Sequence, residues 1–539
     1  MARFGVFAVV FLVNVTLIAI SSLVLVQPAN GSNILGVFLS PSPSHLVIHM
    51  AVVKALAEQG HNVTVVTLYK PKTYHENITN VLIAPTEQRQ AKFDAAIAEL
   101  SSSVKTNFIQ NMARLLNASR TAIDMQFEAF VDRRFTALYE NNDNKFDVAI
   151  LGYVFNDFQV AVGAKFKCPI IMTWVQQPMN YVDHFVGNPH EISYVPTMMN
   201  PLATGEVWNF KKRLQNFFLT TTLRISSFAL DYSMKGYYNK LVEMDSSLPP
   251  FEDMKRNVSL LFCNSHYSEG PIRPLAPATV LIGGIQVKDK PDALPKNIAD
   301  FLDASQQNGA ILFSLGTNVK ESYVKAEAFQ IIYKVLSSLK QNVIWKWGDL
   351  ANTPGNASNI LYQNWLPQDD ILAHPNIRLF ITHAGKGGMV EALYHGVPMV
   401  TIPMFADQPT NSKKIVSEGY GVEVDKLEIT EPIFRNAISE VLTNPSYANK
   451  VKTFSRLYRD RPLSAKESVV YWTEYVIRHR GAAHLQSPLV KMNYIQSANL
   501  DVYLLILGTL FGVFKLLLLV AGYLWKRCRA ANRSKSKDE

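Results

Sequence analysis

A glycine-rich turn in the second half of the chain carries the residue types best suited to chemistry. An apolar stretch ends at Thr382, His383 follows, and Gly385, Gly387 and Gly388 precede a helical pattern. Glycines at a strand–helix junction let the backbone approach a ligand, and the unpaired N–H groups of the first helical turn form a site for a diphosphate. His383 can donate a further hydrogen bond to a phosphate. Glycine-rich turns are common, so this turn alone is weak evidence of function.

Polar side chains around this turn suit the other parts of a sugar nucleotide. Trp365 provides a flat face for stacking a base, and Gln368 can hydrogen-bond to the polar edges of that base. Glu391 can accept hydrogen bonds from ribose hydroxyls, and Asp407 and Gln408 can bind sugar hydroxyls. Structural alternatives exist: Trp365 in the core, Glu391 on a solvated helix face and Asp407 as a helix N-cap. Because all of them occur together, the pattern favours a binding site.

The segment 365–408 resembles the signature of the UDP-glycosyltransferase family of animals in nearly continuous register. The resemblance extends more weakly through Ser44-His45 and residues 313–317 to the C-terminal apolar stretch and basic tail. It implies an α/β fold of the GT-B type, in which two doubly wound, Rossmann-like domains face each other across a crevice. The first domain would bind the acceptor, and the second would bind the UDP-sugar.

The resemblance also implies a role for individual donor-site residues. By position, these are Trp365 stacked on uracil with Gln368 beside it, His383, Gly388 and Thr317 at the diphosphate, Arg273 near the phosphates, Glu391 at the ribose, and Asp407 and Gln408 at the sugar. Relatives commonly carry Asn where this chain has Gly387. A backbone contact would replace a side-chain contact there.

His45 is the candidate catalytic base. It lies just after the first expected strand at the expected start of a helix, and an imidazole titrates near neutral pH. A lone histidine in such a place is usually structural, but the resemblance at Ser44-His45 favours catalysis. In many relatives an Asp orients this histidine, and Gly152 stands at that position here. Asp157 could take its place, the base could act unaided, or Asp157 could simply cap a helix.

The missing Asp keeps a second class of function open. A protein with this donor site could bind UDP-sugars with little or no transferase activity, as a sensor or as a partner of active homologues. Measuring UDP release with a panel of phenols separates the two classes.

The sequence predicts neither a metal ion nor a cofactor, with the UDP-sugar as co-substrate. It contains no Asp-x-Asp pair to hold a metal-bound diphosphate, so the helix N-terminus and His383 would neutralise the leaving UDP. The resemblance implies inversion to a β-glycoside. Asp407 and Gln408 suit glucose, with glucuronate as the alternative because a cation for its carboxylate is not assured. The aromatic and Met-rich loop 176–199 suggests a small lipophilic acceptor, unless it is an ordinary packed loop.

Short apolar runs followed by longer amphipathic stretches predict parallel α/β sheets. Strands are expected at 34–38, 63–68, 148–151, 170–173, 311–315, 343–346, 360–362, 379–382 and 399–402, and helices at 46–59, 92–116, 121–139 and 464–480. The polar, proline-bearing stretch 288–295 suits a linker. The expected parts are a signal peptide (1–29), an acceptor domain (30–287), a donor domain (288–480), a juxtamembrane linker (481–501), a transmembrane helix (502–525) and a basic tail (526–539).

Composition excludes some other classes. The chain has 539 residues with 48% hydrophobic residues, which is sufficient for two domains and membrane segments. Its net charge is +9, but six basic residues lie in the last fourteen positions, so nucleic-acid binding is not expected. Cys168, Cys263 and Cys528 lack the spacing of a zinc site. A Cys168–Cys263 bridge is conceivable, but free packed cysteines are commoner.

The two ends of the chain predict a membrane protein of the secretory pathway. The apolar start reads as a signal peptide, with an uncleaved anchor as the alternative. The second apolar stretch can span a bilayer despite Lys515, and the basic residues that follow it predict type I topology with luminal domains. Lys535 and Lys537 have the spacing of an endoplasmic-reticulum retrieval signal, and Asn-x-Ser/Thr triplets suit a glycosylated lumenal domain: Asn77, Asn117, Asn257 and Asn356. Homo- or hetero-oligomers with other family members are a further expectation.

Overall fold

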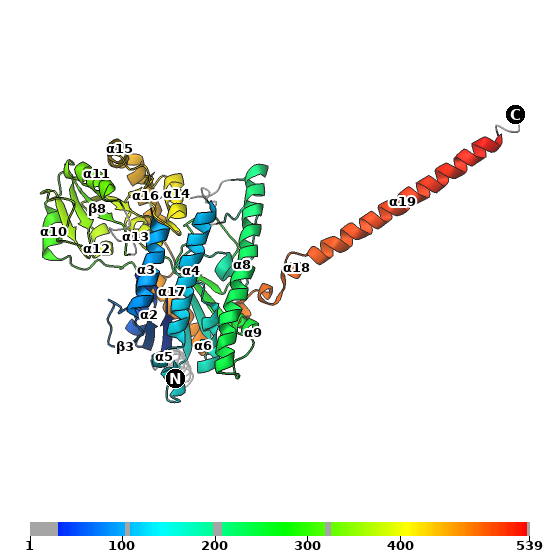
Figure 1. Cartoon of the computed structure of the whole chain (residues 1–539), viewed down its shortest axis with the longest axis horizontal. Coiled ribbons are helices and arrows are strands. Elements are labelled where there is room, and N and C mark those ends of the chain that lie inside the picture. Colours follow the sequence, from blue (N-terminus) through cyan, green and yellow to red (C-terminus); the bar gives the residue numbers. More distant parts are fainter. Residues whose placement is uncertain (1–30, 103–107, 198–206, 318–324, 536–539) are drawn as a thin grey trace, which may run out of the picture.

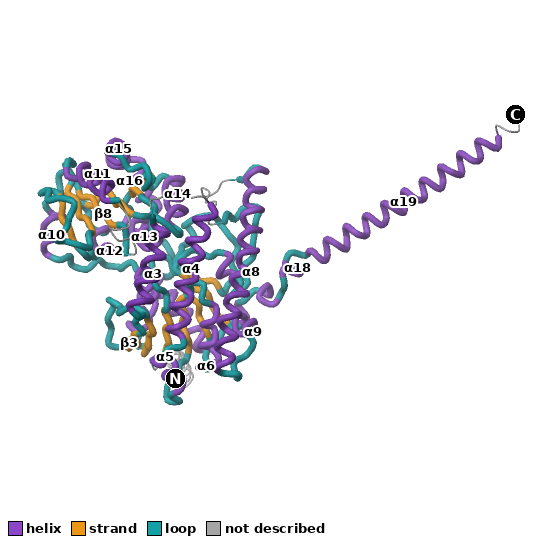
Figure 2. Tube along the Cα trace, in the orientation of Figure 1, coloured by secondary structure: helices purple, strands orange, loops and turns teal. Residues whose placement is uncertain are grey.

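The chain folds around two parallel sheets that occupy separate halves of the body (Figures 1 and 2). This computed structural model describes residues 31–102, 108–197, 207–317 and 325–535. The expected signal peptide and Lys537 lie outside the described residues.

The first sheet has seven strands in the order β3-β2-β1-β4-β5-β6-β7. Their bounds are β1 (Asn33–Phe38), β2 (Asn62–Thr67), β3 (Ile78–Leu82), β4 (Val148–Gly152), β5 (Ile170–Trp174), β6 (Val258–Cys263) and β7 (Thr279–Leu281). Strands β4, β5 and β6 are buried along their whole length, as expected for a parallel sheet covered on both faces. The half-exposed edge strand β3 lacks such an apolar run and escaped the sequence prediction.

Helices cover this sheet, and some of their bounds differ from the predicted ones. They are α2 (Pro43–Glu58), α3 (Glu87–Ser101), α4 (Phe108–Phe130), α5 (Arg133–Glu140), α6 (Ala161–Phe166), α7 (Asn180–Asp183), α8 (Phe210–Met244) and α9 (Phe251–Arg256). The expected helices 92–116 and 121–139 were wrongly divided, because α4 runs through 117–120. Thr86 instead caps the start of α3 and Asp132 the start of α5. The sequence prediction also missed α8.

The second sheet has six strands in the order β10-β9-β8-β11-β12-β13. They are β8 (Ala310–Ser314), β9 (Asn342–Lys346), β10 (Ile360–Gln363), β11 (Ile377–Thr382), β12 (Met399–Thr401) and β13 (Gly421–Glu423). Alternate residues along the strands enter two separate apolar clusters, one on each face. The helices are α10 (Lys296–Asp303), α11 (Ala326–Ser337), α12 (Gln368–Leu372), α13 (Lys386–His395), α14 (Gln408–Glu418), α15 (Glu431–Thr443) and α16 (Pro445–Arg459).

The chain crosses between the two halves twice. It leaves the first half after β7, and α17 (Ala465–His479) returns to it, where Val469 and Val476 join the core around the first sheet. The two crossings lie side by side, because Lys466 Nζ is 2.9 Å from a carboxylate oxygen of Asp289. Near the return, Arg461 donates to the carbonyl oxygens of Leu281 and Gly283. The expected donor domain at 288–480 stays a prediction. Within that range, α17 packs on the first half.

Two helices end the described chain. The short α18 (Tyr494–Ser497) leads into α19 (Leu500–Lys535), which projects away from the body (Figure 1). Residues 500–530 of α19 are long and apolar enough to cross a membrane, with a mean hydropathy of 2.5, and none of them is buried against the protein.

Candidate functional site

The turn between β11 and α13 brings the His383 ring against two glycines. A Cβ atom at Gly316 would lie 2.5 Å from Cε1 of His383, and one at Gly385 would lie 2.4 Å from Nε2. Any larger residue would displace the ring. Burial lowers the pKa of His383 to about 4, opposed by the carboxylate of Asp407, so the imidazole is neutral near pH 7. Its ring can therefore donate one hydrogen bond without carrying a charge.

Glu391 and Gln368 meet on one side of this turn. Gln368 Nε2 donates to Oε2 of Glu391 over 2.6 Å, and a Cβ atom at Gly388 would lie 3.1 Å from the same nitrogen. Burial, reinforced by the negative charge of Asp369, raises the pKa of Glu391 to about 8. The structure thus brings Gln368, Gly388 and Glu391 together.

Trp365 is half exposed, with a relative exposure of 50%, so it is not the core residue of the structural alternative. Lys72 lies over its ring, with Nζ 4.5 Å from the centroid. Lys72 belongs to the loop between β2 and β3 of the first half. The Trp365 ring thus lies where the two halves meet, with one face covered by a cation.

Asp407 lies between the halves as well. Its Oδ2 accepts from Nε2 of Gln176 over 2.8 Å and from Nδ2 of Asn411 over 2.7 Å. Asn411 also donates to the carbonyl oxygen of Ala384, which ties α14 to the His383 turn. Asp407 occupies the N-cap position of α14 without a side-chain capping bond.

Gln408 is buried, and its Oε1 accepts from the backbone N–H groups of Met404 and Phe405. Its amide nitrogen is therefore the atom that can donate to a sugar.

His45 lies in the first turn of α2, on the first half, and faces the Asp407 charge. Its Nδ1 is 3.0 Å from the hydroxyl oxygen of Ser40. Burial lowers the pKa of His45 to about 4, and the carboxylate of Asp407 opposes that shift. Asp407 of the second half acts electrostatically on His45 of the first half and on His383 of its own, so its carboxylate lies near both rings.

Asp157 does not serve His45 in this structure. Its Oδ1 lies 3.2 Å from Nε2 of His184, and its Oδ2 accepts from the Tyr153 hydroxyl over 3.2 Å. No hydrogen bond among the described residues joins Asp157 to His45. The catalytic role predicted for Asp157 therefore finds no support here. Asp157 begins a 3₁₀ turn, and its side chain contacts His184 in the loop around α7.

Gly152, where the orienting Asp was expected, lies against a second histidine. A Cβ atom there would be 3.0 Å from Nε2 of His49 and 3.1 Å from Cδ1 of Phe38. His49 stacks on Phe38, with ring centroids 4.9 Å apart, and is fully buried. Neither ring nitrogen of His49 has a hydrogen-bond partner within the part of the chain that the structure describes.

Three further residues of the predicted donor site remain: Arg273, Thr317 and Gly387. Arg273 donates to the carbonyl oxygen of Pro178 and lies 4.0 Å from Asp183, so it holds the loop around α7 rather than the donor turn. Thr317 is exposed just after β8. A Cβ atom at Gly387 would meet open space, so the position could hold the Asn of relatives.

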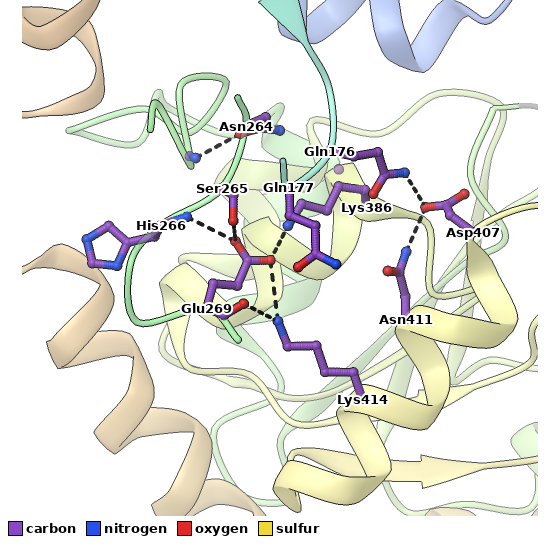
Figure 3. Close-up of polar contacts among 12 residues, drawn as sticks. Gln176, Gln177, Asn264, Ser265, His266, Glu269, Lys386, Asp407, Asn411 and Lys414 are labelled. Carbon is purple, nitrogen blue, oxygen red and sulfur yellow. Dashed lines mark hydrogen bonds and ion pairs between the residues drawn. The ribbon is translucent and has the colours of Figure 1, made fainter. Parts of the chain in front are cut away.

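A buried ionic cluster joins the two halves and was not recognised in the sequence (Figure 3). Glu269, after β6, accepts from Nζ of Lys386, the first residue of α13, and Lys414 of α14 donates to its backbone oxygen over 2.5 Å. Burial opposes ionisation of Glu269, but the two lysines keep its pKa below the ordinary value. Burial lowers the pKa of Lys414 to about 8. Since Glu269 is distant in sequence from both lysines, no local pattern could have revealed this cluster.

Cys168 and Cys263 are buried free thiols, so the bridge between them is not formed. Among the described residues, no group of three His, Cys, Asp or Glu side chains is arranged to hold a metal ion.

Two halves, each built on a parallel sheet covered by helices, have the architecture of the GT-B fold. The UDP-glucosyltransferase of Polygonum tinctorium that glucosylates indoxyl shares this fold, with a TM-score of 0.54 and 13% identity, over 84% of this chain and 99% of that one.

Sequence comparison narrows the class further. The family profile described as UDP-glucoronosyl and UDP-glucosyl transferase matches residues 37–535, and the chain belongs to this family. UDP-glucosyltransferase 2 of Dactylopius coccus is 33% identical over 90% of this chain and 92% of its own length. UDP-glucuronosyltransferase 2A1 of Mus musculus is 29% identical over 92% and 94%, respectively. The chain is thus a UDP-glycosyltransferase.

Proposed function

We propose that this enzyme transfers a hexosyl group from a UDP-sugar to a hydroxyl of a small lipophilic acceptor, with inversion and without a metal ion or cofactor. The observation that supports the proposal is that Asp407, which Gln176 of the first half hydrogen-bonds, lies close enough to act electrostatically on both His45 of the first half and His383 of the second. A base on one side and a diphosphate site on the other place an acceptor oxygen opposite a leaving UDP.

The reaction assigns each group one task. Nε2 of His45 removes the acceptor proton as the acceptor oxygen attacks the anomeric carbon, and the bond from that carbon to the UDP oxygen breaks. The N–H groups at the start of α13 and the neutral His383 ring bind the departing diphosphate. Lys346, which donates to the carbonyl oxygen of Gly316 over 2.6 Å, adds positive charge nearby.

Glucose is our preferred sugar, with glucuronate as the alternative. Asp407 and the amide nitrogen of Gln408 offer an acceptor and a donor for sugar hydroxyls. The nearby Lys386 and Lys414 are both engaged by Glu269, so neither is the free cation that a glucuronate carboxylate would need.

A lipophilic acceptor is supported by aromatic side chains at the carboxyl ends of β4 and β5. Tyr153 packs against Trp174 with ring centroids 5.6 Å apart, and Phe155 packs against Tyr181 at 5.1 Å. Phe155 and Tyr181 are only half buried. An apolar ring of an acceptor could stack on them close to Gly152 and the start of α2.

Turnover by the purified full-length chain tests this proposal directly. UDP release would be measured with UDP-glucose and with UDP-glucuronate, against a panel of phenols. His45→Ala should lower kcat by roughly 10²- to 10⁴-fold, whereas the control His479→Ala on α17 should not. Binding of UDP-sugar without turnover on any acceptor would instead favour a sensor or partner subunit. Activity lost in EDTA and restored by manganese would overturn the metal-free mechanism.

We further propose an endoplasmic-reticulum membrane location with type I topology and a luminal body. The apolar α19, followed by basic residues, supports an anchor of this orientation. Sensitivity of the body to glycosidase after detergent treatment, and of the tail to protease in sealed microsomes, tests it. A protected tail would reverse the assignment. Oligomers with other family members stay a prediction for the detergent-solubilised protein.

A further inference from the structure

The buried hydroxyl of Ser40 lies beside Nδ1 of the His45 imidazole. Ser40 follows β1 with a relative exposure of 4%, and its Oγ lies 3.0 Å from Nδ1 of His45. The backbone N–H of Ser42 donates to the same oxygen over 3.2 Å, which fixes the hydroxyl in place. A serine oxygen has two lone pairs and can accept from both groups at once.

The space that an orienting carboxylate would need is already filled. The rings of His49 and Phe38 would contact a Cβ atom at Gly152 at 3.0 and 3.1 Å, which is tighter than ordinary van der Waals contact. His49 lies one helical turn after His45 on α2, so the same helix supplies both the base and the side chain that blocks this space. Asp157 is held by Tyr153 and His184 instead.

We propose that Ser40 is the positioning residue of the base: its Oγ accepts the Nδ1–H of His45, which leaves Nε2 as the unprotonated nitrogen that takes the acceptor proton. This inference rests on the proposed transferase function and deepens it. His49 occupies the place of the carboxylate partner, so the histidine of this chain works with a neutral hydroxyl.

The exchange of a carboxylate for a hydroxyl has a chemical consequence. A hydroxyl fixes the tautomer and orientation of the ring, but it adds no negative charge to stabilise the imidazolium formed during transfer. The charge that favours the imidazolium is that of Asp407, which belongs to the other half. The base is therefore complete only when both halves are together.

Steady-state kinetics of the full-length enzyme tests the role of Ser40. Ser40→Ala should lower kcat by roughly 10- to 100-fold with the KM for UDP-sugar unchanged, because a misplaced tautomer affects only proton transfer. Ser40→Thr keeps the hydroxyl and should restore most of the activity. Ser42→Ala removes a hydroxyl from the same loop that does not contact His45 and should behave as wild type.

A double-mutant cycle separates positioning from a merely structural role. In a His45→Ala background, Ser40→Ala should have no further effect on kcat, because Ser40 acts through the missing ring. Equal losses in both backgrounds would overturn the inference. The triple variant Ser40→Ala/His49→Ala/Gly152→Asp removes the His49 ring and supplies a carboxylate at position 152. It should be more active than Ser40→Ala. Because a carboxylate raises the pKa of the nearby imidazole, the acidic limb of kcat/KM should also move to higher pH.

The outcomes distinguish this inference from the proposed function. If His45→Ala abolishes turnover while Ser40→Ala matches Ser42→Ala, the transferase stands and the role of Ser40 falls. If His45→Ala retains full turnover, the base itself is misassigned, and both proposals fail.

Discussion

His45 and Glu391 are titratable residues whose surroundings oppose their usual charge near neutral pH. Burial keeps His45 neutral and Glu391 protonated in the ligand-free protein. A neutral imidazole is ready to accept a proton, whereas a protonated carboxyl must lose one before both of its oxygens act as charged acceptors for the ribose hydroxyls. Substrate binding and proton transfer should therefore respond to pH in different ranges.

For His45, the acidic limb of kcat/KM should lie near pH 4. A pKa of about 4, below the ordinary 6.5, means that the base stays unprotonated as the pH falls through 6.5. When UDP-sugar is saturating, so that the protonation of Glu391 does not limit donor binding, the pH profile of kcat/KM for the acceptor should be flat from about pH 5.5 to 7. An acidic limb centred near 6.5 would contradict it.

For Glu391, the affinity for UDP should rise with pH up to about 8. Below its pKa of about 8, binding to the carboxylate form must release a proton, so the Kd should fall by up to about tenfold per pH unit as the pH rises. Glu391→Gln cannot ionise and should show a Kd independent of pH over this range. Calorimetric titration of UDP at several pH values measures both proteins.

Individual residues of the donor site could be predicted where local sequence determines their place. His383 directly follows β11, Asp407 precedes α14 after β12, and Glu391 lies in α13, the helix after β11. The carboxyl ends of such strands share one edge of a parallel sheet. Ser40 with His45, Glu269 with Lys386, and Gln176 with Asp407 depend on side-chain orientation or on how the halves pack. No pattern along the chain carries that information.

Among the elements, the helix α13 and the loop after β8 each carry a glycine, and the two positions place opposite demands on the backbone. Gly387 lies inside the helix next to open space, whereas Gly316, on the facing loop, has φ +82° and a virtual Cβ 2.5 Å from the His383 ring. Only the second position needs glycine for its conformation and its close contact.

Gly387→Ala should therefore stabilise the enzyme by about 0.5–1 kcal/mol, because alanine is the better helix former. Gly316→Ala should destabilise it and displace His383, which would raise the KM for UDP-sugar. Thermal unfolding and donor kinetics of the two variants provide the comparison. Destabilisation by Gly387→Ala would show that its surroundings are less open than described.

Buried strands were the elements most readily predicted, because each is an apolar run closed by polar or turn residues. The half-exposed β3 and the long, largely exposed α8 have no such signature. Helix boundaries near Ser101 and Asp132 were misplaced since capping, rather than apolar periodicity, determines where these helices begin and end.

At the scale of the whole molecule, Glu269 is the ionic link between the halves. Removal of one partner from a buried ionic cluster leaves uncompensated charge, so Glu269→Gln should lower the free energy of unfolding by about 3–5 kcal/mol. Glu269→Gln combined with Lys386→Met removes one of the orphaned charges and should recover part of that loss. Denaturant unfolding measures both, and equal losses in the single and double variants would argue against the link.

The paired crossings at Asp289 and Lys466 make the donor-binding half an insertion within the acceptor-binding half rather than an appendage to it. The inserted half can rotate about the line through its two tethers, the linking segments at Asp289 and Lys466. These tethers prevent it from separating completely from the other half. A protease that cuts one tether would divide the chain into two fragments, but the donor half would stay covalently joined to part of the other half through the second tether. The two halves can thus separate far enough to admit a nucleotide. The two linking segments then guide them back to their original positions.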